Sequence, residues 1–61
     1  MCLSNAYRES DHTLLMAETD QVAMEGDVLI LKDLFGTERR IPGGIVTSVD
    51  FEQNTLTIRC E

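Results

Sequence analysis

The sequence pattern is clearest in residues 21–31, which read QVAMEGDVLIL. Val22 and Met24 alternate with polar or small residues, and this period of two is typical of a β-strand. Residues 25–27 (EGD) predict a tight hairpin turn, because glycine accepts the positive φ angles that such turns require. The uninterrupted apolar run at 28–31 has the length of a strand, and we expect it to be central and covered on both faces.

Further strands are expected on both sides of this hairpin. Residues 12–18 (HTLLMAE) fit either a buried strand or a helical turn, and residues 19–20 are expected to end that element. No window combines helix caps with a sustained period of 3.6 residues. We therefore predict an all-β fold, a small closed or partly open antiparallel β-barrel (SH3/Sm-like or OB-like) of six to seven short strands, in one domain spanning residues 1–61. The other expected strands are residues 1–8, 37–41, 45–50 and 55–60, separated by breaks at 34–36, 42–44 and 51–54.

The chain of 61 residues has 11 acidic and five basic residues, a net charge of −6, and two cysteines. The acidic charge argues against binding nucleic acid through phosphate neutralisation. No apolar segment has the length of a membrane helix and the first residues lack the pattern of a signal peptide, so we expect a cytoplasmic protein with reduced thiols. The short length argues against an independent enzyme. It also limits the core to marginal stability, which a bound metal or a second copy of the chain would increase.

Cys2 is the candidate metal ligand. If Met1 is removed, the α-amine and thiolate of Cys2 can chelate one ion in a five-membered ring, releasing both protons near neutral pH. Nitrogen and thiolate donors suit a late transition metal, with square-planar geometry favouring Ni(II) or Cu(II) and tetrahedral geometry Zn(II). Two copies related by a two-fold axis would supply four donors. A chain that retains Met1 offers only the thiolate and a backbone amide, and we expect it to hold no nickel.

Both cysteines also have structural interpretations. Cys2 lies near the beginning of an expected strand, and a free cysteine most often acts as a small hydrophobic side chain. A Cys2–Cys60 disulfide is disfavoured in a reducing compartment. Cys60 alternates with Leu56 and Ile58, so we expect it to lie with them in the core.

His12, Leu34 and Phe35 are further candidate site residues. His12 is the single histidine and a candidate secondary metal ligand. A solvent-exposed turn residue is nevertheless the favoured interpretation, because no second ligand has a suitable spacing to it. Leu34 and Phe35 form an apolar pair at a break in the strand pattern. If they are exposed, they are a candidate dimer or partner contact.

Several motifs occur in a recognisable order along the chain. They are MCLS at 1–4, LLM at 14–16, Val22, EGD at 25–27, LFG at 34–36, RRI at 39–41, and VD and LTI within 49–58. Together they resemble the CooT family of small nickel-binding proteins associated with carbon monoxide dehydrogenase maturation. The resemblance implies a cytosolic homodimer built on a small β-barrel, with a Ni(II) site at the N-terminus that depends on Cys2. The first residues are also similar to HypC-type hydrogenase maturation chaperones, which the remainder of the chain fits less well.

Two functions from different classes follow from these observations. The leading hypothesis is a nickel-binding accessory protein that captures Ni(II) through Cys2 across a homodimer. It would serve maturation of a metalloenzyme such as carbon monoxide dehydrogenase, or nickel handling. The alternative is a non-catalytic RNA- or protein-binding β-barrel module without metal, with Arg39 and Arg40 as its candidate nucleic-acid contacts. Because neighbouring strand residues point to opposite faces, a solvated strand edge is the favoured interpretation of these two arginines.

Overall fold

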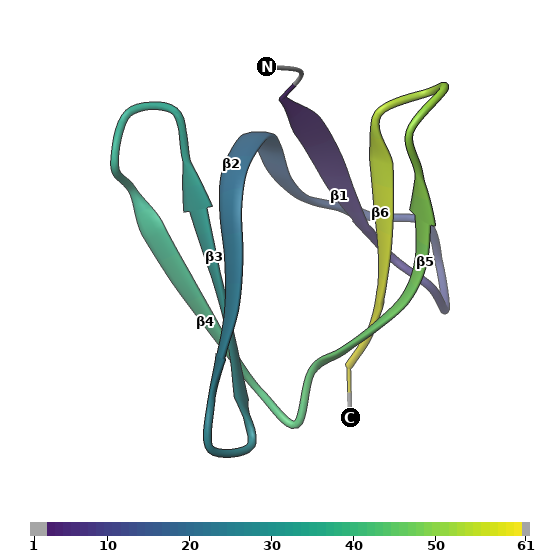
Figure 1. The fold of residues 1–61 in the computed structure, drawn as a ribbon. Helices are drawn as coiled ribbons and strands as arrows, with labels where there is room; N and C mark the ends of the chain where they lie inside the picture. Colours follow the sequence, from purple (N-terminus) through teal and green to yellow (C-terminus); the bar gives the residue numbers. More distant parts are fainter. Residues whose placement is uncertain (1–2, 61) are drawn as a thin grey trace.

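The computed structural model describes residues 3–60, which form six β-strands in one sheet (Figure 1). The strands are β1 (Ser4–Arg8), β2 (Leu14–Glu25), β3 (Val28–Asp33), β4 (Glu38–Pro42), β5 (Ile45–Asp50) and β6 (Thr55–Arg59). Their order across the sheet is β4-β3-β2-β1-β6-β5. No helix in this part of the chain is long and apolar enough to cross a membrane. The predicted all-β class and the predicted number of strands are confirmed.

The β2–β3 hairpin forms where the sequence predicts it. Gly26 lies in its turn with φ +64°, a conformation that glycine adopts without steric cost. Within β3, Leu29 and Leu31 are buried, whereas Val28 and Ile30 are only half-buried. The expectation that this apolar run is covered on both faces is therefore wrong. Since all six strands belong to one sheet folded on itself, the side of β3 away from the core is not covered by a second layer.

A bend in β2 divides the sheet into two halves. The first part of β2 pairs with β1, and the part after Thr19 pairs with β3. At the bend, Glu18 has φ +54° and the register shifts between Thr19 and Gln21. The hydroxyl of buried Thr19 donates a hydrogen bond to the Met16 carbonyl at 3.4 Å. The predicted break at 19–20 is thus a bulge within one long strand, and the ambiguous segment before it is a strand.

The predicted antiparallel barrel needs two corrections. First, β1 and β6 pair in parallel, with Asn5 opposite Thr55 and Arg8 opposite Ile58. This is possible because β2 to β5 together form the long crossover that a parallel pair requires. Second, the sheet does not close: β4 and β5 remain at its two ends and are not paired with each other. The structure is therefore a bent, open sheet and not a closed barrel.

The core lies between the two halves of the bent sheet. Val46 and Cys60 pack against it, which confirms the predicted core position of Cys60. The three largest fully buried side chains are Leu29, Leu31 and Ile58. Both halves contribute to the cluster, because Leu29 and Leu31 belong to β3 and Ile58 belongs to β6. The buried cluster consists of Ala6, Leu15, Met16, Leu29, Leu31, Ile41, Leu56 and Ile58.

An arginine connects β4 with the first part of β2. Arg39 Nη1 donates a hydrogen bond of 2.8 Å to the Leu15 carbonyl oxygen. These two strand segments are not neighbours in the sheet order, since β3 pairs with β4 and the first part of β2 pairs with β1. Arg39 therefore holds the bent sheet together on this side.

The link between β4 and β5 depends on a close backbone approach at Gly44. A Cβ atom at this position would lie 2.8 Å from Ile41 Cγ2 and 3.1 Å from Leu29 Cβ. The preceding residue donates a hydrogen bond from Gly43 N to the Asp27 carbonyl at 2.8 Å. Only glycine fits between these neighbours without displacing the core.

We predict that Gly44→Ala destabilises the fold by about 1–3 kcal/mol, because the added methyl group overpacks the core beside Ile41 and Leu29. Urea unfolding followed by circular dichroism measures this change. Ser48→Ala, at an exposed position in β5, is the control and should change stability by less than about 0.5 kcal/mol. Equal stability of the Gly44→Ala variant and the wild type would contradict the close approach.

Arg39 and Arg40 offer a matched pair of substitutions. Arg39→Met removes the hydrogen bond to Leu15 and should cost about 1 kcal/mol, whereas Arg40→Met removes exposed ion pairs and should cost less than about 0.5 kcal/mol. Methionine retains much of the aliphatic stem in both variants. Denaturant midpoints measure the difference, and a larger loss for Arg40→Met would refute the structural role of Arg39.

Candidate functional site

Cys2 lies outside the described residues, but the structure describes the end of the sheet at which β1 begins. Three backbone segments meet there, beside the start of β1 (Figure 1). Asn5 N donates to the Asn54 carbonyl at 2.9 Å, and Asn5 Oδ1 accepts from Glu18 N at 3.3 Å. The Glu18 carbonyl in turn accepts from Leu34 N at 3.0 Å. These bonds join the beginning of β1 to the β5–β6 turn, the β2 bend and the β3–β4 turn.

The carboxylates in the adjacent turns are engaged by backbone groups. Asp33 Oδ1 accepts hydrogen bonds from Phe35 N and Thr37 N, both at 2.9 Å. Asp50 Oδ1 accepts from the backbone N–H groups of residues 52 and 53 at 2.9 and 3.0 Å. Among residues 3–60, no three His, Cys, Asp or Glu side chains form a potential metal cluster. The described part of one chain therefore provides no complete ligand set by itself.

His12 lies in the β1–β2 turn, at the opposite end of β1 from Ser4. Its φ is +60°, and its backbone N–H donates to the Arg8 carbonyl at 2.8 Å. The imidazole stacks on the Tyr7 ring, with ring centroids 4.7 Å apart and an interplanar angle of 3°. The rise of about 3.3 Å per residue places the length of β1, about 13 Å, between this turn and the start of the strand. The favoured interpretation of His12 as an exposed turn residue agrees with this placement.

Asp11, which precedes His12, also stabilises the turn. Hydrogen bonds from the Thr13 side chain, and then from the Thr13 backbone N–H at 3.1 Å, hold the pKa of Asp11 below its usual value. Arg8 Nε lies 3.4 Å from the same carboxylate oxygen. The carboxylate of Asp11, the acidic neighbour of His12, is thus bonded to Thr13 and Arg8 within the β1–β2 turn.

Cys60 is half-buried and follows the last residue of β6. The parallel register places Ile58 level with Arg8, so Cys60 lies beyond the end of β1 opposite to Ser4. Cys60 therefore packs against the core and lies away from the beginning of β1.

Arg39 and Arg40, the candidate nucleic-acid contacts, are both bonded to other groups of the chain. Arg40 lies 3.7 Å from a Glu25 oxygen and 3.3 Å from a Glu38 oxygen, while Arg39 binds the Leu15 carbonyl. Both arginines and Arg8 line a depression of about 230 Å³ beside Cys60. Carboxylates offset the charges of Arg8 and Arg40 there, so the depression is not a free basic patch.

Exposed apolar side chains occupy the turns beside the start of β1. Leu34 and Phe35 in the β3–β4 turn are 53% and 80% exposed, and Phe51 in the β5–β6 turn is 87% exposed. These are the two phenylalanines of the chain, and both turns lie at the same end of the sheet (Figure 1). The sequence predicts Leu34 and Phe35 as a candidate contact but does not predict Phe51. A phenylalanine in an otherwise polar turn is the signal that could have identified it.

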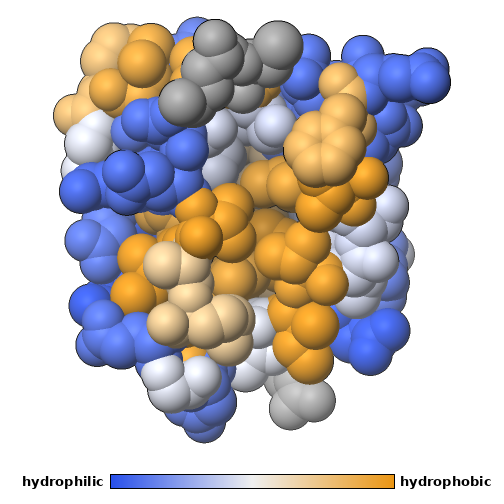
Figure 2. Space-filling model, viewed as in Figure 1, coloured by the Kyte–Doolittle hydropathy of each residue, from blue (hydrophilic) through white to orange (hydrophobic). Residues whose placement is uncertain are grey.

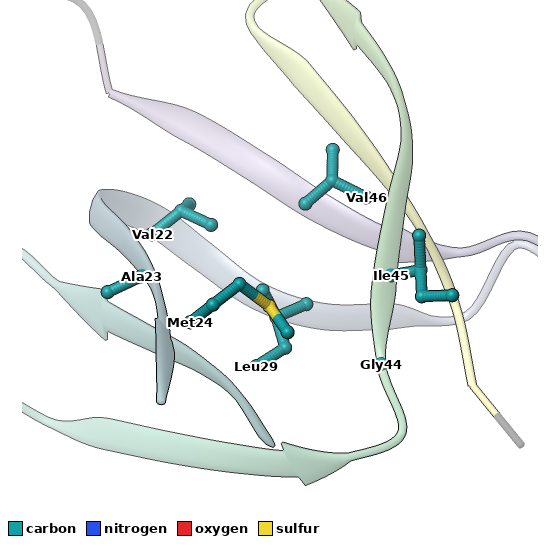
Figure 3. A pocket seen from close by; sticks show the side chains of 7 residues that line it. All are labelled: Val22, Ala23, Met24, Leu29, Gly44, Ile45 and Val46. Atoms are coloured by element: carbon teal, nitrogen blue, oxygen red, sulfur yellow. The ribbon is translucent and has the colours of Figure 1, made fainter. Parts of the chain in front are cut away.

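A second exposed apolar surface lies between β2 and β5. Here a cavity of about 350 Å³, which we call the mouth, is lined by Val22, Ala23, Met24, Leu29, Gly44, Ile45 and Val46. Figure 2 shows apolar residues gathered along the centre of this face, between hydrophilic flanks. In Figure 3, Val22 and Met24 point from β2 toward β5, and Val46 points back toward them. None of the lining residues is charged.

Comparisons with known proteins give the chain a family. No curated protein sequence matches it significantly. A crystal structure assigned to CooT of Carboxydothermus hydrogenoformans has a TM-score of 0.88 and 16% sequence identity, with 98% of each chain covered, and shows a shared fold. The family model for the CO dehydrogenase accessory protein CooT matches residues 1–59. The chain therefore belongs to the CooT family, whose members are accessory proteins of CO dehydrogenase rather than enzymes.

Proposed function

We propose that this protein captures Ni(II) through Cys2, with two chains sharing one ion, and holds or delivers it during maturation of a nickel enzyme. The observation that carries the proposal is the family match, which begins at residue 1 and therefore includes Cys2. The accessory role named for this family supports a task in metalloenzyme maturation. CO dehydrogenase is the client that the family description suggests. A reducing cytoplasm would keep the Cys2 thiol available.

The donor chemistry supports nickel as the cargo. The thiolate of Cys2 and a nitrogen of the same residue form a chelating pair, and such nitrogen and sulfur donors suit a late transition metal. One pair fills only two positions, and the described residues of a chain provide no cluster to complete the set. A second chain related by a two-fold axis supplies the same pair again, which gives four donors.

The exposed side chains around the start of β1 are the proposed contact with the client. Leu34, Phe35 and Phe51 lie in the two turns that are hydrogen-bonded, directly or through Glu18, to the beginning of β1. Large exposed apolar side chains that gather at one end of a small protein commonly mark an interaction site. A client that docks here would approach the end of the chain that carries Cys2.

The alternative RNA-binding function has weaker support. Arg39 and Arg40 are the candidate contacts, but one binds a backbone carbonyl and the other lies between two glutamates. The net charge of −6 would repel a phosphate backbone. The nickel hypothesis is therefore the better account of the chain.

Nickel titration of protein from which Met1 has been removed tests the proposal. We expect saturation at one ion per two chains and a thiolate-to-nickel absorption band. Cys2→Ser should abolish the band and weaken binding at least about a hundredfold, since it removes every sulfur ligand of the site. Isothermal titration calorimetry and absorption spectroscopy measure both effects.

Two control variants accompany this titration. Cys60→Ala removes the other thiol and should leave nickel affinity unchanged, because Cys60 lies against the core. His12→Asn preserves a residue that tolerates positive φ and should also bind nickel as the wild type does. Equal nickel affinity of the wild type and the Cys2→Ser variant would refute the proposed site.

A further inference from the structure

We infer that the end of the sheet at which β1 begins accepts a cationic segment of the client, in which arginine or lysine side chains alternate with apolar ones. The inference rests on the client contact proposed above at Leu34, Phe35 and Phe51, and it adds the chemistry of the partner. It follows from the way charge is distributed over the molecule.

The negative charge of the described residues is concentrated at this end. Figure 1 shows that the start of β1, the bend of β2, the β3–β4 turn and the β5–β6 turn lie together there. Among residues 3–60, this end has six carboxylates and one ammonium group, which gives a net charge of −5. The remaining described residues have four charges of each sign and a net charge of zero. We call the first region the acidic end; its charged residues are Glu18, Asp20, Lys32, Asp33, Glu38, Asp50 and Glu52.

Most carboxylates of the acidic end have no cationic partner among residues 3–60. Of the four ion pairs in this part of the chain, one includes a carboxylate of the acidic end, Glu38, which lies 3.3 Å from Arg40. Asp33 and Asp50 accept backbone hydrogen bonds, which hold them in place without adding a positive charge. The fully exposed and unpaired carboxylates are those of Glu18, Asp20 and Glu52.

Exposed apolar side chains share the acidic end with these carboxylates. Leu34 and Phe35 directly follow Asp33, and Phe51 lies between the acidic residues 50 and 52. The turns that carry them follow β3 and precede β6, which are three positions apart in the sheet. At about 4.8 Å per strand, this separation is about 14 Å, which an extended segment of about five residues covers.

This combination of groups selects a cationic side chain that also has an apolar or planar body. A guanidinium group stacks on an aromatic face and pairs with a carboxylate, and a lysine stem covers apolar surface while its ammonium group reaches an acid. An anionic partner is repelled by the local charge. A neutral apolar segment would cover the phenylalanines but would desolvate the neighbouring carboxylates without compensation.

Salt limits this attraction to the acidic end. Asp27 precedes β3 and Asp33 is its last residue, so about 20 Å separate these two acids along the strand. The Debye length is about 10 Å at 0.1 M salt, so charges at the opposite end act only weakly on a partner bound here. A charge change at one end can therefore be compared with the same change at the other.

Fluorescence anisotropy with three labelled peptides tests the inference. The peptides share the same leucine positions and carry arginine, glutamine or glutamate at the alternating positions. We expect the arginine peptide to bind at least about tenfold more tightly than the glutamine peptide at about 0.05 M salt, with a smaller difference at about 0.5 M. The glutamate peptide should not bind. Equal affinities for the arginine and glutamine peptides would overturn the inference.

Two charge reversals that change the net charge equally locate the binding surface. Glu52→Lys acts at the acidic end and should weaken binding of the arginine peptide at least about fivefold. Asp27→Lys, in the β2–β3 turn at the opposite end, should change it less than about twofold. Equal effects of the two reversals would show non-specific attraction to an acidic protein and would overturn the proposed surface.

Two leucines test the apolar part of the surface. Leu34 and Leu14 are 53% and 49% exposed, and Leu14 lies at the opposite end, where it pairs with Tyr7. Leu34→Ser and Phe51→Ser should each weaken binding of the arginine peptide at least about threefold, whereas Leu14→Ser should leave it unchanged. Circular dichroism verifies that each variant is folded. Unchanged binding in both the Leu34→Ser and Phe51→Ser variants would indicate attraction by charge alone and would overturn the docking surface.

These measurements involve neither nickel nor Cys2, so the two proposals fail separately. A Cys2→Ser variant should bind the arginine peptide as the wild type does. A chain that binds the arginine peptide but whose nickel affinity is insensitive to Cys2→Ser would refute the metal site and leave the docking surface intact. A chain that binds nickel through Cys2 but does not prefer the arginine peptide would refute the docking surface alone.

Discussion

The bend of β2 at Glu18 and Thr19 is the constraint on which the rest of the structure depends. Glu18 adopts φ +54°, and its two backbone groups leave the strand ladder: its N–H donates to Asn5 Oδ1 and its carbonyl accepts from Leu34 N. The next residue, Thr19, is buried and bonds back to Met16. A left-handed residue costs roughly 1 kcal/mol or more, so these partners must offset the strain. The same bonds gather the turns around the start of β1.

The bend also makes the two sides of the sheet unequal. On one side, Arg39 reaches the Leu15 carbonyl and joins β4 to the first part of β2. On the other side, the second part of β2 moves away from β1 and leaves the mouth between itself and β5. The exposed apolar lining of the mouth is therefore a consequence of the change of pairing partner along β2.

The sequence predicted those features that depend on neighbouring residues. The turn at 25–27 requires only a glycine between two apolar runs, and the alternation of Leu56, Ile58 and Cys60 is a property of one strand. The bend, in contrast, depends on Asn5 and Leu34, which lie far from Glu18 along the chain. The residue types at 19–20 do not by themselves distinguish a turn between two strands from a bulge within one strand.

The same limit applies to the parallel pairing and to the candidate sites. Parallel pairing of the first and last strands is a relation between distant segments, which alternation within each strand does not encode. For the sites, local reasoning correctly treated His12 as a turn residue and Cys60 as a core residue. The proximity of Phe51 to the start of β1 arises only when the β5–β6 turn folds against Asn5.

The surroundings of the chain start also bear on which metal this protein would select. An acidic protein offers many oxygen ligands, which favour hard cations. In the turns at this end, however, Asp33 and Asp50 each accept two backbone hydrogen bonds through Oδ1, and these bonds hold both carboxylates in place. Because these carboxylates are held by their turns, the sulfur and nitrogen of Cys2 would set the metal preference of the proposed site. Such donors rank nickel above the earlier divalent metals, and a client with a nickel centre is consistent with that order.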